Sequence, residues 1–175
     1  MILTIIIPVF NEKNTIRKII KKIKSVKGIK KQIILVDDGS NDGTKEIIKN
    51  ELLYKIDKVI FHQKNLGKGA AIISAKRFIK GEIVIIQDAD LEYDPKDLVK
   101  IYNVMKSKKF KVVYGSRVLN KNKFQNTKNF THLVRIWGNI FLTKFSNLIN
   151  KQKLTDAHTC YKVFESKIFK NINLK

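Results

Sequence analysis

Carboxylates gather directly after one strongly apolar stretch of the chain. Residues 83–86 are four consecutive β-branched aliphatic residues, and Asp88 and Asp90 follow them almost at once. Such a run predicts a strand that is covered on both faces, as in a parallel sheet. Ligands of open α/β sheets bind at the carboxyl ends of the strands, and Mg²⁺ and Mn²⁺ prefer carboxylate and phosphate oxygens. The stretch therefore favours a metal–diphosphate site.

The same stretch also has a structural explanation. Five of the chain's 15 acidic residues fall within residues 88–97, and an acidic loop that caps the next helix would contain several of them. Asp94 followed by Pro95 is a favourable helix start. We assign Asp94 and Asp97 to helix capping, and Asp88 and Asp90, which lie closest to the strand, to the site.

A second acidic loop follows another apolar run, residues 32–36. It contains Asp37, Asp38 and Asp42 together with two glycines, so the two loops hold eight of the 15 acidic residues. Carboxylates gathered at two strand ends favour a bound cation. Asp, Asn, Ser and Gly also favour turns for local reasons, so turn chemistry explains this loop equally well.

A lysine between two glycines, Lys68, lies at the start of a helical pattern. A helix N-terminus with such a lysine can bind phosphate. The segment is shorter than a phosphate-binding P-loop, and a tight turn is the simpler interpretation of the residues alone. His62, at the end of an apolar segment, is interpreted as a strand residue rather than a ligand.

Apolar strands and amphipathic segments alternate along the chain. Strands are predicted at residues 3–9, 32–36, 58–62, 83–86 and 111–114, with a last strand ending at Phe164. Helical periodicity is found in residues 16–23, 44–52, 68–79, 98–105 and 132–150. This order predicts an α/β fold with a mostly parallel central sheet and helices on both faces. Residues 118–131 are polar and predict a mobile loop.

Composition limits the classes of function. A chain of 175 residues with 43% hydrophobic residues suits one folded domain, its one cysteine excludes an internal disulfide, and no apolar run has membrane-spanning length. The net charge of +21 comes from 32 lysines and four arginines, and the lysines are spread over every predicted helix. A general lysine bias explains this pattern better than nucleic-acid binding, so we expect no nucleic-acid partner.

Five ordered motifs resemble those of the family 2 glycosyltransferases. They are residues 6–12 (IIPVFNE), 36–40 (VDDGS), 65–69 (NLGKG), 87–92 (QDADLE) and 115–117 (GSR). The segment 154–164 (LTDAHTCYKVF) is similar to the branch of dolichyl- and polyprenyl-phosphate sugar synthases. The resemblance covers essentially the whole chain. It implies one catalytic domain of the GT-A fold over residues 1–175.

Within that domain, the resemblance implies a nucleotide-sugar part, residues 1–117, and an acceptor part, residues 118–175. Members of the family usually continue past the segment around Cys160, so we expect a chain that is truncated at its C-terminus.

The resemblance also implies roles for individual residues. The nucleotide-sugar donor would contact Pro8, Phe10, Glu12, Val36, Asp38, Lys68, Asp88, Ala89, Asp90 and Arg117. Asp38 would accept a hydrogen bond from the base. Asp88, Asp90 and Glu92 would hold the cofactor, Mg²⁺ or Mn²⁺, with Asp90 as the firmest ligand. Glu92 replaces a glutamine that is common in the branch, and its added negative charge would change the metal preference.

The catalytic set that the resemblance implies is Asp90, Arg117, Arg135 and Asp156. Arg117 would contact donor or acceptor phosphates, and Arg135 the acceptor phosphate, although Ile136 replaces a second arginine that is common there. Asp156 would act as a general base only if the acceptor is a hydroxyl. Otherwise it caps or orients its loop, and both interpretations stay open.

The implied reaction is transfer of a sugar, with inversion, from a UDP- or GDP-sugar to a polyprenyl phosphate. Such an acceptor implies a peripheral protein at the cytoplasmic face of a membrane, with a membrane-anchored partner as one possibility. The aromatic stripe of residues 132–150 suits a helix at the lipid surface, but packing onto the sheet is the commoner role of such a stripe. Transfer to a glycan hydroxyl in cell-surface polysaccharide synthesis, and a non-catalytic nucleotide-sugar-binding fragment, are the alternatives.

Overall fold

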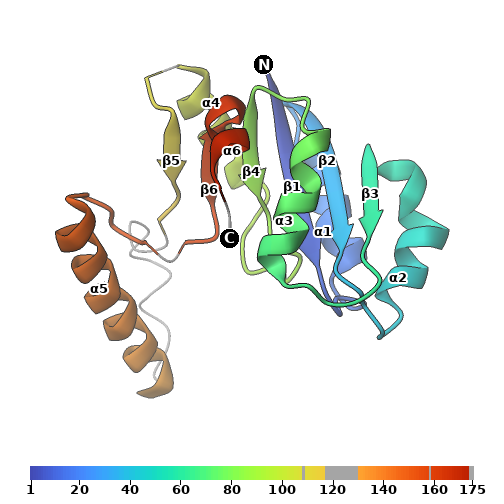
Figure 1. The fold of residues 1–175 in the computed structure, drawn as a ribbon, viewed down its shortest axis with the longest axis horizontal. Helices are drawn as coiled ribbons and strands as arrows, with labels where there is room; N and C mark the ends of the chain where they lie inside the picture. The colour runs from blue at the N-terminus through green and yellow to red at the C-terminus, as the bar shows by residue number, and fades with distance from the viewer. Residues whose placement is uncertain (108, 117–129, 158, 174–175) are drawn as a thin grey trace. The chain divides into compact units, whose positions relative to one another are not determined.

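The computed structural model describes residues 1–107, 109–116, 130–157 and 159–173, with only the backbone for residues 130–136. Its strands form one sheet in the order β3-β2-β1-β4-β6-β5 (Figure 1). The strands are β1 (Ile2–Val9), β2 (Lys30–Asp37), β3 (Lys58–Phe61), β4 (Ile83–Ile86), β5 (Val112–Tyr114) and β6 (Lys162–Glu165). The predicted α/β class is confirmed.

The centre of the sheet is parallel because its strands are apolar on both faces. β1 pairs with β2 over their full lengths, from Ile2 opposite Lys30 to Val9 opposite Asp37. β4 and β3 extend the parallel arrangement on either side, whereas β6 pairs with β4 in the antiparallel direction. Most side chains of β1 and β2 are buried, as expected for a sheet with helices on both faces. A mostly parallel sheet was predicted and is found.

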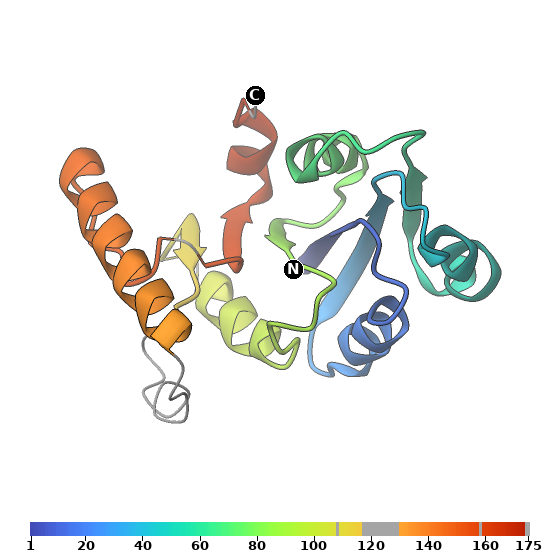
Figure 2. The ribbon, with the colours of Figure 1, turned by 90° about the horizontal axis from the view of Figure 1, so that it is seen from below.

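Helices cover both faces of this sheet. They are α1 (Ile16–Ser25), α2 (Thr44–Ile47), α3 (Lys68–Ala75), α4 (Asp97–Lys106) and α6 (Ser166–Asn171). The chain also contains a longer helix, α5 (Phe130–Asn150). Short turns of other helix types extend α2, through η1 (Ile48–Leu52) and η2 (Leu53–Lys55), and α3, through η3 (Lys76–Phe78). Figure 2 shows α3 and α6 on one face and α1 and α4 on the other.

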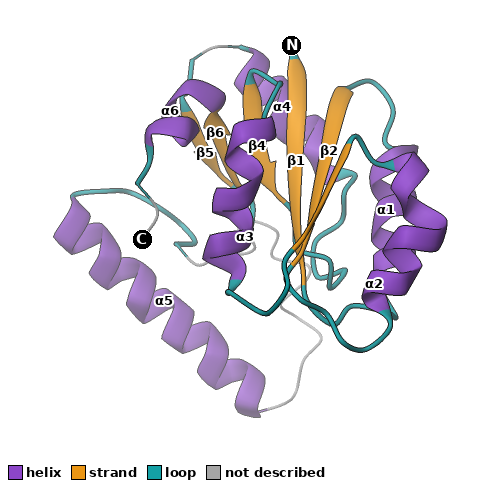
Figure 3. Cartoon of the chain, turned by 45° about the vertical axis from the view of Figure 1, so that its right-hand side comes forward, coloured by secondary structure: helices purple, strands orange, loops and turns teal. Residues whose placement is uncertain are grey.

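Apolar periodicity explains both helical layers. In α1 the buried residues are Ile16, Ile19, Ile20 and Ile23, which is the spacing of one helix face. On the opposite face, α3 packs Ala71 and Ala75 into a core that also includes Ile6, Ile34 and Phe169 of α6. Figure 3 shows α1 and α3 flanking the parallel strands β1 and β2. The last helix thus belongs to the same core as the first strands.

The start of α4 differs from the prediction. The helix begins at Asp97, two residues beyond Pro95. The Asp94 carboxylate accepts a hydrogen bond from the Lys96 amide at 3.1 Å, and the Asp94 carbonyl accepts one from the Asp97 amide at 3.0 Å. Asp94 therefore closes a turn ahead of the helix instead of capping it.

The chain divides into two compact units, residues 1–113 with 163–175 and residues 114–162. Within the second unit, α5 is tied to the segment that follows it. The Asn147 side chain exchanges two hydrogen bonds with the backbone of Leu154, and the Thr143 hydroxyl accepts one from the Ala157 amide at 3.2 Å. The predicted division of function at residue 117 stays a prediction.

The predicted loop at residues 118–131 falls mostly outside the described residues, and residues 130 and 131 belong to α5. No helix in the described part of the chain combines the length and apolar character needed to span a membrane.

Candidate functional site

Three central strands deliver their following loops to one edge of the sheet. β1 and β2 end opposite each other at Val9 and Asp37. Beyond the strand ends the backbone remains tied, because the Asp38 amide donates to the Val9 carbonyl at 2.8 Å and the Gln87 amide to the Ile6 carbonyl at 2.9 Å. Parallel strand ends of this kind are where open α/β folds bind ligands.

The buried Asp38 carboxylate accepts three hydrogen bonds at this edge. Its Oδ1 accepts from the His62 ring nitrogen Nδ1 at 2.7 Å and from the Leu66 amide at 3.0 Å. Its Oδ2 accepts from the Gly67 amide at 2.8 Å. The other ring nitrogen of His62 lies 2.9 Å from the Ser74 hydroxyl. Asp38 therefore fixes the loop between β3 and α3.

The charge of Asp38 is favoured by these contacts. Burial by itself raises the pKa of Asp38, but hydrogen bonds from the Leu66 amide, the His62 ring and the Gly67 amide outweigh it, so the pKa lies below its ordinary value of 3.8. With Asp38 ionised, His62 donates from Nδ1 to the carboxylate.

Sequence reasoning missed the role of His62. The parallel register that pairs Asp37 with Phe61 places the next residues, Asp38 and His62, side by side. The contact between Asp38 and His62 could have been predicted only from this strand register, which the sequence pattern alone does not provide.

The loops after β1 and β2 are bonded to each other. The Ser40 hydroxyl accepts from the Asn11 amide at 2.9 Å, and the Asn11 side chain accepts from the Asn41 amide at 3.0 Å. The Glu12 amide donates to the Thr44 hydroxyl at 2.8 Å. The loop containing the predicted donor residues Phe10 and Glu12 is thus held against the Asp38 loop, whereas the third predicted donor residue, Pro8, lies within β1.

The acids of the second loop divide between local and buried roles. Asp42 accepts from the amide and the hydroxyl of Thr44 at 3.0 and 2.5 Å, which is turn chemistry. Asp37 is fully buried and neither of its oxygens makes a hydrogen bond of normal geometry. Burial raises the pKa of Asp37, and the nearby Ser40 and Lys45 offset this only in part.

The loop after β4 contains the predicted metal ligands Asp88, Asp90 and Glu92. Asp88 forms an ion pair with Lys68 at the start of α3, with 2.5 Å between Lys68 Nζ and Asp88 Oδ1. Asp90 and Glu92 are exposed, and the Glu92 amide donates to Asp90 Oδ1 at 2.9 Å. Ala89 between the acids is buried. The structure thus brings Lys68, Asp88 and Asp90 to the predicted edge of the sheet.

The carboxylates of Asp88 and Asp90 suit a hard divalent cation that is also held by the phosphates of a bound substrate. No group of three metal-ligating side chains converges among the residues that the structure describes. Mg²⁺ is often held by only one or two carboxylates plus substrate phosphates, so Asp88 and Asp90 fit such a site. A diphosphate would supply the remaining oxygens.

The other predicted residues are placed less completely. Val36 is buried in the core beneath α3. Arg117 lies outside the described residues, and Arg135 lies in α5, where only the backbone is described. Asp156 is 1% exposed and accepts from the Asn139 side chain at 3.3 Å, so it holds the segment after α5. The donor role of Val36 and the catalytic roles of the others stay predictions.

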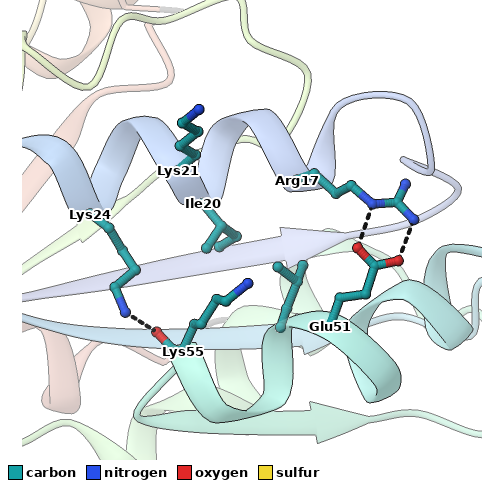
Figure 4. A pocket seen from close by; sticks show the side chains of 7 residues that line it. Arg17, Ile20, Lys21, Lys24, Glu51 and Lys55 are labelled. Carbon is teal, nitrogen blue, oxygen red and sulfur yellow. Dashed lines mark hydrogen bonds and ion pairs between the residues drawn. The ribbon is translucent and has the colours of Figure 1, made fainter.

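An open pocket lies away from these strand ends, between α1 and the helical turns η1 and η2 (Figure 4). Arg17 donates two hydrogen bonds to the Glu51 carboxylate, at 2.7 and 2.5 Å. The pocket is lined by Arg17, Ile20, Lys21, Lys24, Glu51, Leu52 and Lys55. None of the predicted site residues is among them.

The chain belongs to glycosyl transferase family 2. The family model described as "Glycosyl transferase family 2" matches residues 4–172, which is nearly the whole chain. Four of the five motifs that suggested this family lie at or directly after the ends of β1, β2, β3 and β4.

Several curated proteins are similar to this chain. The uncharacterized protein MJ1222 of Methanocaldococcus jannaschii is 32% identical over 171 residues, 96% of this chain and 66% of the relative. The dolichol-phosphate mannosyltransferase of Pyrococcus furiosus is 29% identical, with 77% and 38% covered. The UDP-N-acetylglucosamine–dolichyl-phosphate N-acetylglucosaminyltransferase of Methanococcus voltae is 28% identical, with 95% and 70% covered. The chain therefore spans from about 40% to 70% of these relatives' lengths.

Solved structures of other glycosyltransferases share the fold. The glucosyl-3-phosphoglycerate synthase of Mycobacterium tuberculosis, in complex with Mn²⁺, UDP and glucosyl-3-phosphoglycerate, gives a TM-score of 0.67 at 16% identity, over 95% of this chain and 57% of that one. The chain has the GT-A fold, as expected.

Replacing Gly39 by alanine should disrupt the contact between the loop after β2 and the loop between β3 and α3. Gly39 has a positive φ of 75°, and an added Cβ would lie 2.5 Å from the Lys64 carbonyl carbon. Gly28 has a similar φ of 82° but open space around it. We expect Gly28→Ala to lower the free energy of unfolding by about 1–2 kcal/mol, the cost of a left-handed backbone. Gly39→Ala should cost clearly more, because the backbone at Lys64 must move. Equal losses in urea unfolding would contradict this packing.

Replacing Asp37 by asparagine should stabilise the protein in a pH-dependent manner. Because the folded-state pKa of Asp37 is raised, the carboxyl disfavours folding increasingly as the pH rises through that pKa. The gain in melting temperature of Asp37→Asn over the unmutated protein should therefore be larger at pH 8 than near pH 4. A gain that is independent of pH would contradict the burial of a charge here.

Asp42→Asn is the matched control, because its effect on stability should be opposite in sign to that of Asp37→Asn. The pKa of Asp42 is lowered, mainly by the hydrogen bonds from Thr44, which outweigh desolvation. Its charge therefore contributes stability above the ordinary pKa of 3.8, and this contribution is lost as the pH falls. Asp42→Asn should destabilise the protein near neutral pH, and the loss should shrink in acid.

Proposed function

We propose that this chain is the catalytic part of an inverting glycosyltransferase that moves a sugar from a nucleotide sugar to a polyprenyl phosphate. The observation that carries the proposal is the arrangement of Lys68, Asp88 and Asp90 at the carboxyl edge of a parallel sheet. Family membership supports the reaction class. Two relatives named for transfer to dolichol or dolichyl phosphate support the acceptor class.

On the donor side, the loops supply contacts of opposite charge. Asp38 accepts a hydrogen bond from the base, and Lys68 donates to the diphosphate. Asp88, Asp90 and Glu92 would hold Mg²⁺ or Mn²⁺, which when bound would supply positive charge to the departing diphosphate. Phe10, which is exposed, and Glu12 line the nucleotide pocket.

On the acceptor side, a phosphate oxygen attacks the anomeric carbon from the face opposite the diphosphate. The new carbon–oxygen bond forms as the bond to the diphosphate breaks, and the electron pair leaves with the diphosphate, so the configuration inverts. A phosphate is ionised near neutral pH, so the step needs no strong general base. Arg117 and Arg135 position the acceptor, because the planar guanidinium suits phosphate.

A glycan hydroxyl is the second candidate acceptor. A hydroxyl must lose its proton, and Asp156 is the residue that would take it. Asp156 is buried and bonded to Asn139, which favours its role in holding the loop. We therefore place phosphate transfer first.

The donor site should depend on metal through Asp90. Nucleotide diphosphate should bind at least tenfold more tightly with Mn²⁺ or Mg²⁺ present, because the cation neutralises carboxylates and phosphates together. Asp90→Ala should abolish that gain. Asp94→Ala is the control, since its carboxylate closes a turn ahead of α4. Calorimetry that shows equal affinity with and without metal in the unmutated protein would refute the site.

Transfer to lipid should depend on Arg135. We expect the protein, when incubated with polyprenyl phosphate, Mn²⁺ and a panel of UDP- and GDP-sugars, to form a lipid-linked sugar phosphate. This product can be separated by chromatography. Arg135→Ala should lower the use of the lipid phosphate by tenfold or more and leave donor affinity nearly intact, because the guanidinium contacts only the acceptor. Loss of donor affinity with unchanged use of lipid phosphate would show that the assigned roles are wrong.

The acceptor also suggests where the protein works. In the second unit, α5 exposes large apolar side chains, with Trp137 71% and Phe141 69% exposed. The rings of Phe141 and Phe145 stack with centroids 6.4 Å apart. A polyprenyl tail stays in the bilayer, so we propose that α5 lies at the lipid headgroups of the cytoplasmic face, alone or beside a membrane-anchored partner.

Vesicle binding tests this placement. The unmutated protein should sediment with anionic vesicles at low salt and be released as salt rises, because the lysines add attraction to anionic lipids. Trp137→Glu should weaken sedimentation several-fold with the fold retained. Tyr54→Glu is the control, because Tyr54 is a 90% exposed aromatic residue outside α5. If the unmutated protein stays in the supernatant at low salt, a soluble hydroxyl acceptor becomes the better proposal.

A further inference from the structure

The hydrogen bonds of Asp38 limit what else its carboxylate can bind. An ionised carboxylate offers about four acceptor positions, two on each oxygen. His62 and the Leu66 amide occupy both positions of Oδ1, and the Gly67 amide occupies one position of Oδ2. One position on Oδ2 is left. Asp38 is 3% exposed, which also suits one further contact at most.

The three donors are held in place by their own surroundings. The Ser74 hydroxyl fixes the other side of the His62 ring at 2.9 Å. The Gly67 amide is also within 2.9 Å of the Asn65 side-chain oxygen. Gly39 lies so close to the Lys64–Asn65 backbone that a Cβ could not fit between them. The loop therefore does not move without disturbing several packed groups, so the second oxygen of Asp38 stays occupied.

Nucleobases differ in how many donors they present to a carboxylate. Guanine presents two adjacent donors, N1–H and the N2 amino group, and pairs best with a carboxylate that accepts on both oxygens. Uracil and thymine present one donor, N3–H, between two carbonyl acceptors. A carboxylate with one free acceptor position can therefore satisfy the single N3–H of uracil or thymine. With guanine it would leave one of the two donors without a hydrogen-bond partner.

We infer that the donor of this protein is a pyrimidine-dione nucleotide, a uridine or thymidine diphosphate sugar, and that Asp38 with its three fixed donors excludes guanosine diphosphate sugars. The inference rests on the proposed function, because it takes Asp38 as the residue that contacts the base. His62 is a positioning residue in this scheme, since it acts on the base only through Asp38.

Calorimetry of the whole chain with Mn²⁺ and each of UDP, dTDP and GDP tests the inference. UDP or dTDP should bind at least tenfold more tightly than GDP, which corresponds to about 1.4 kcal/mol. The ratio of UDP to dTDP affinity distinguishes the two pyrimidine sources. GDP binding as tightly as both pyrimidine nucleotides, or more tightly, would overturn the inference while leaving the proposed function intact. If no nucleotide binds, the proposed function itself fails.

Two variants separate base selection from a merely structural role. His62→Phe frees one acceptor position on Asp38, so the preference for UDP over GDP should shrink several-fold. Ser74→Ala keeps all three bonds to Asp38, so its UDP-to-GDP ratio should equal that of the unmutated protein. A His62→Phe protein that loses affinity for both nucleotides equally would show that His62 only supports the loop. Should His62→Phe fail to fold, the comparison of nucleotides in the unmutated protein still decides the inference.

Discussion

The buried charge of Asp38 is the constraint on which the rest of the site depends. A carboxylate removed from water must find hydrogen-bond donors, because an unpaired buried charge is strongly destabilising. His62, Leu66 and Gly67 supply them, which ties the end of β2 to the end of β3 and to the loop that begins α3. The position of Lys68 at the start of α3, and hence its ion pair with Asp88, follows from that connection.

The sheet makes this arrangement possible. Parallel pairing of β1 with both β2 and β4 brings three loops to one edge, and helices cover both faces of these strands. Opposite charges then alternate across it, from Asp38 to Lys68 to Asp88. A nucleotide diphosphate has a base that donates hydrogen bonds and phosphates that need cations, so the same alternation matches its two ends.

Much of this was predictable from local patterns. The uninterrupted β-branched run before Asp88 and the isoleucine spacing of α1 each specify an element through burial, and both elements were found. What failed depends on distant or competing contacts. Asp94 was predicted to cap a helix because Pro95 follows it, yet it closes a turn ahead of α4. The partnership of His62 with Asp38 follows only from strand register, and the pairing of Lys68 with Asp88 needs the packed fold. Neither of these two contacts can be predicted from the periodicity of the sequence.

The central claim is that a nucleotide diphosphate sits at the carboxyl ends of β1, β2 and β4. Hydrogen exchange of the backbone amides, with and without UDP and Mn²⁺, tests it most directly. We expect slower exchange at Leu66, Gly67 and residues 88–90, with no change around the pocket between α1 and the turns η1 and η2. Protection confined to that pocket, with the strand-end loops unchanged, would contradict it.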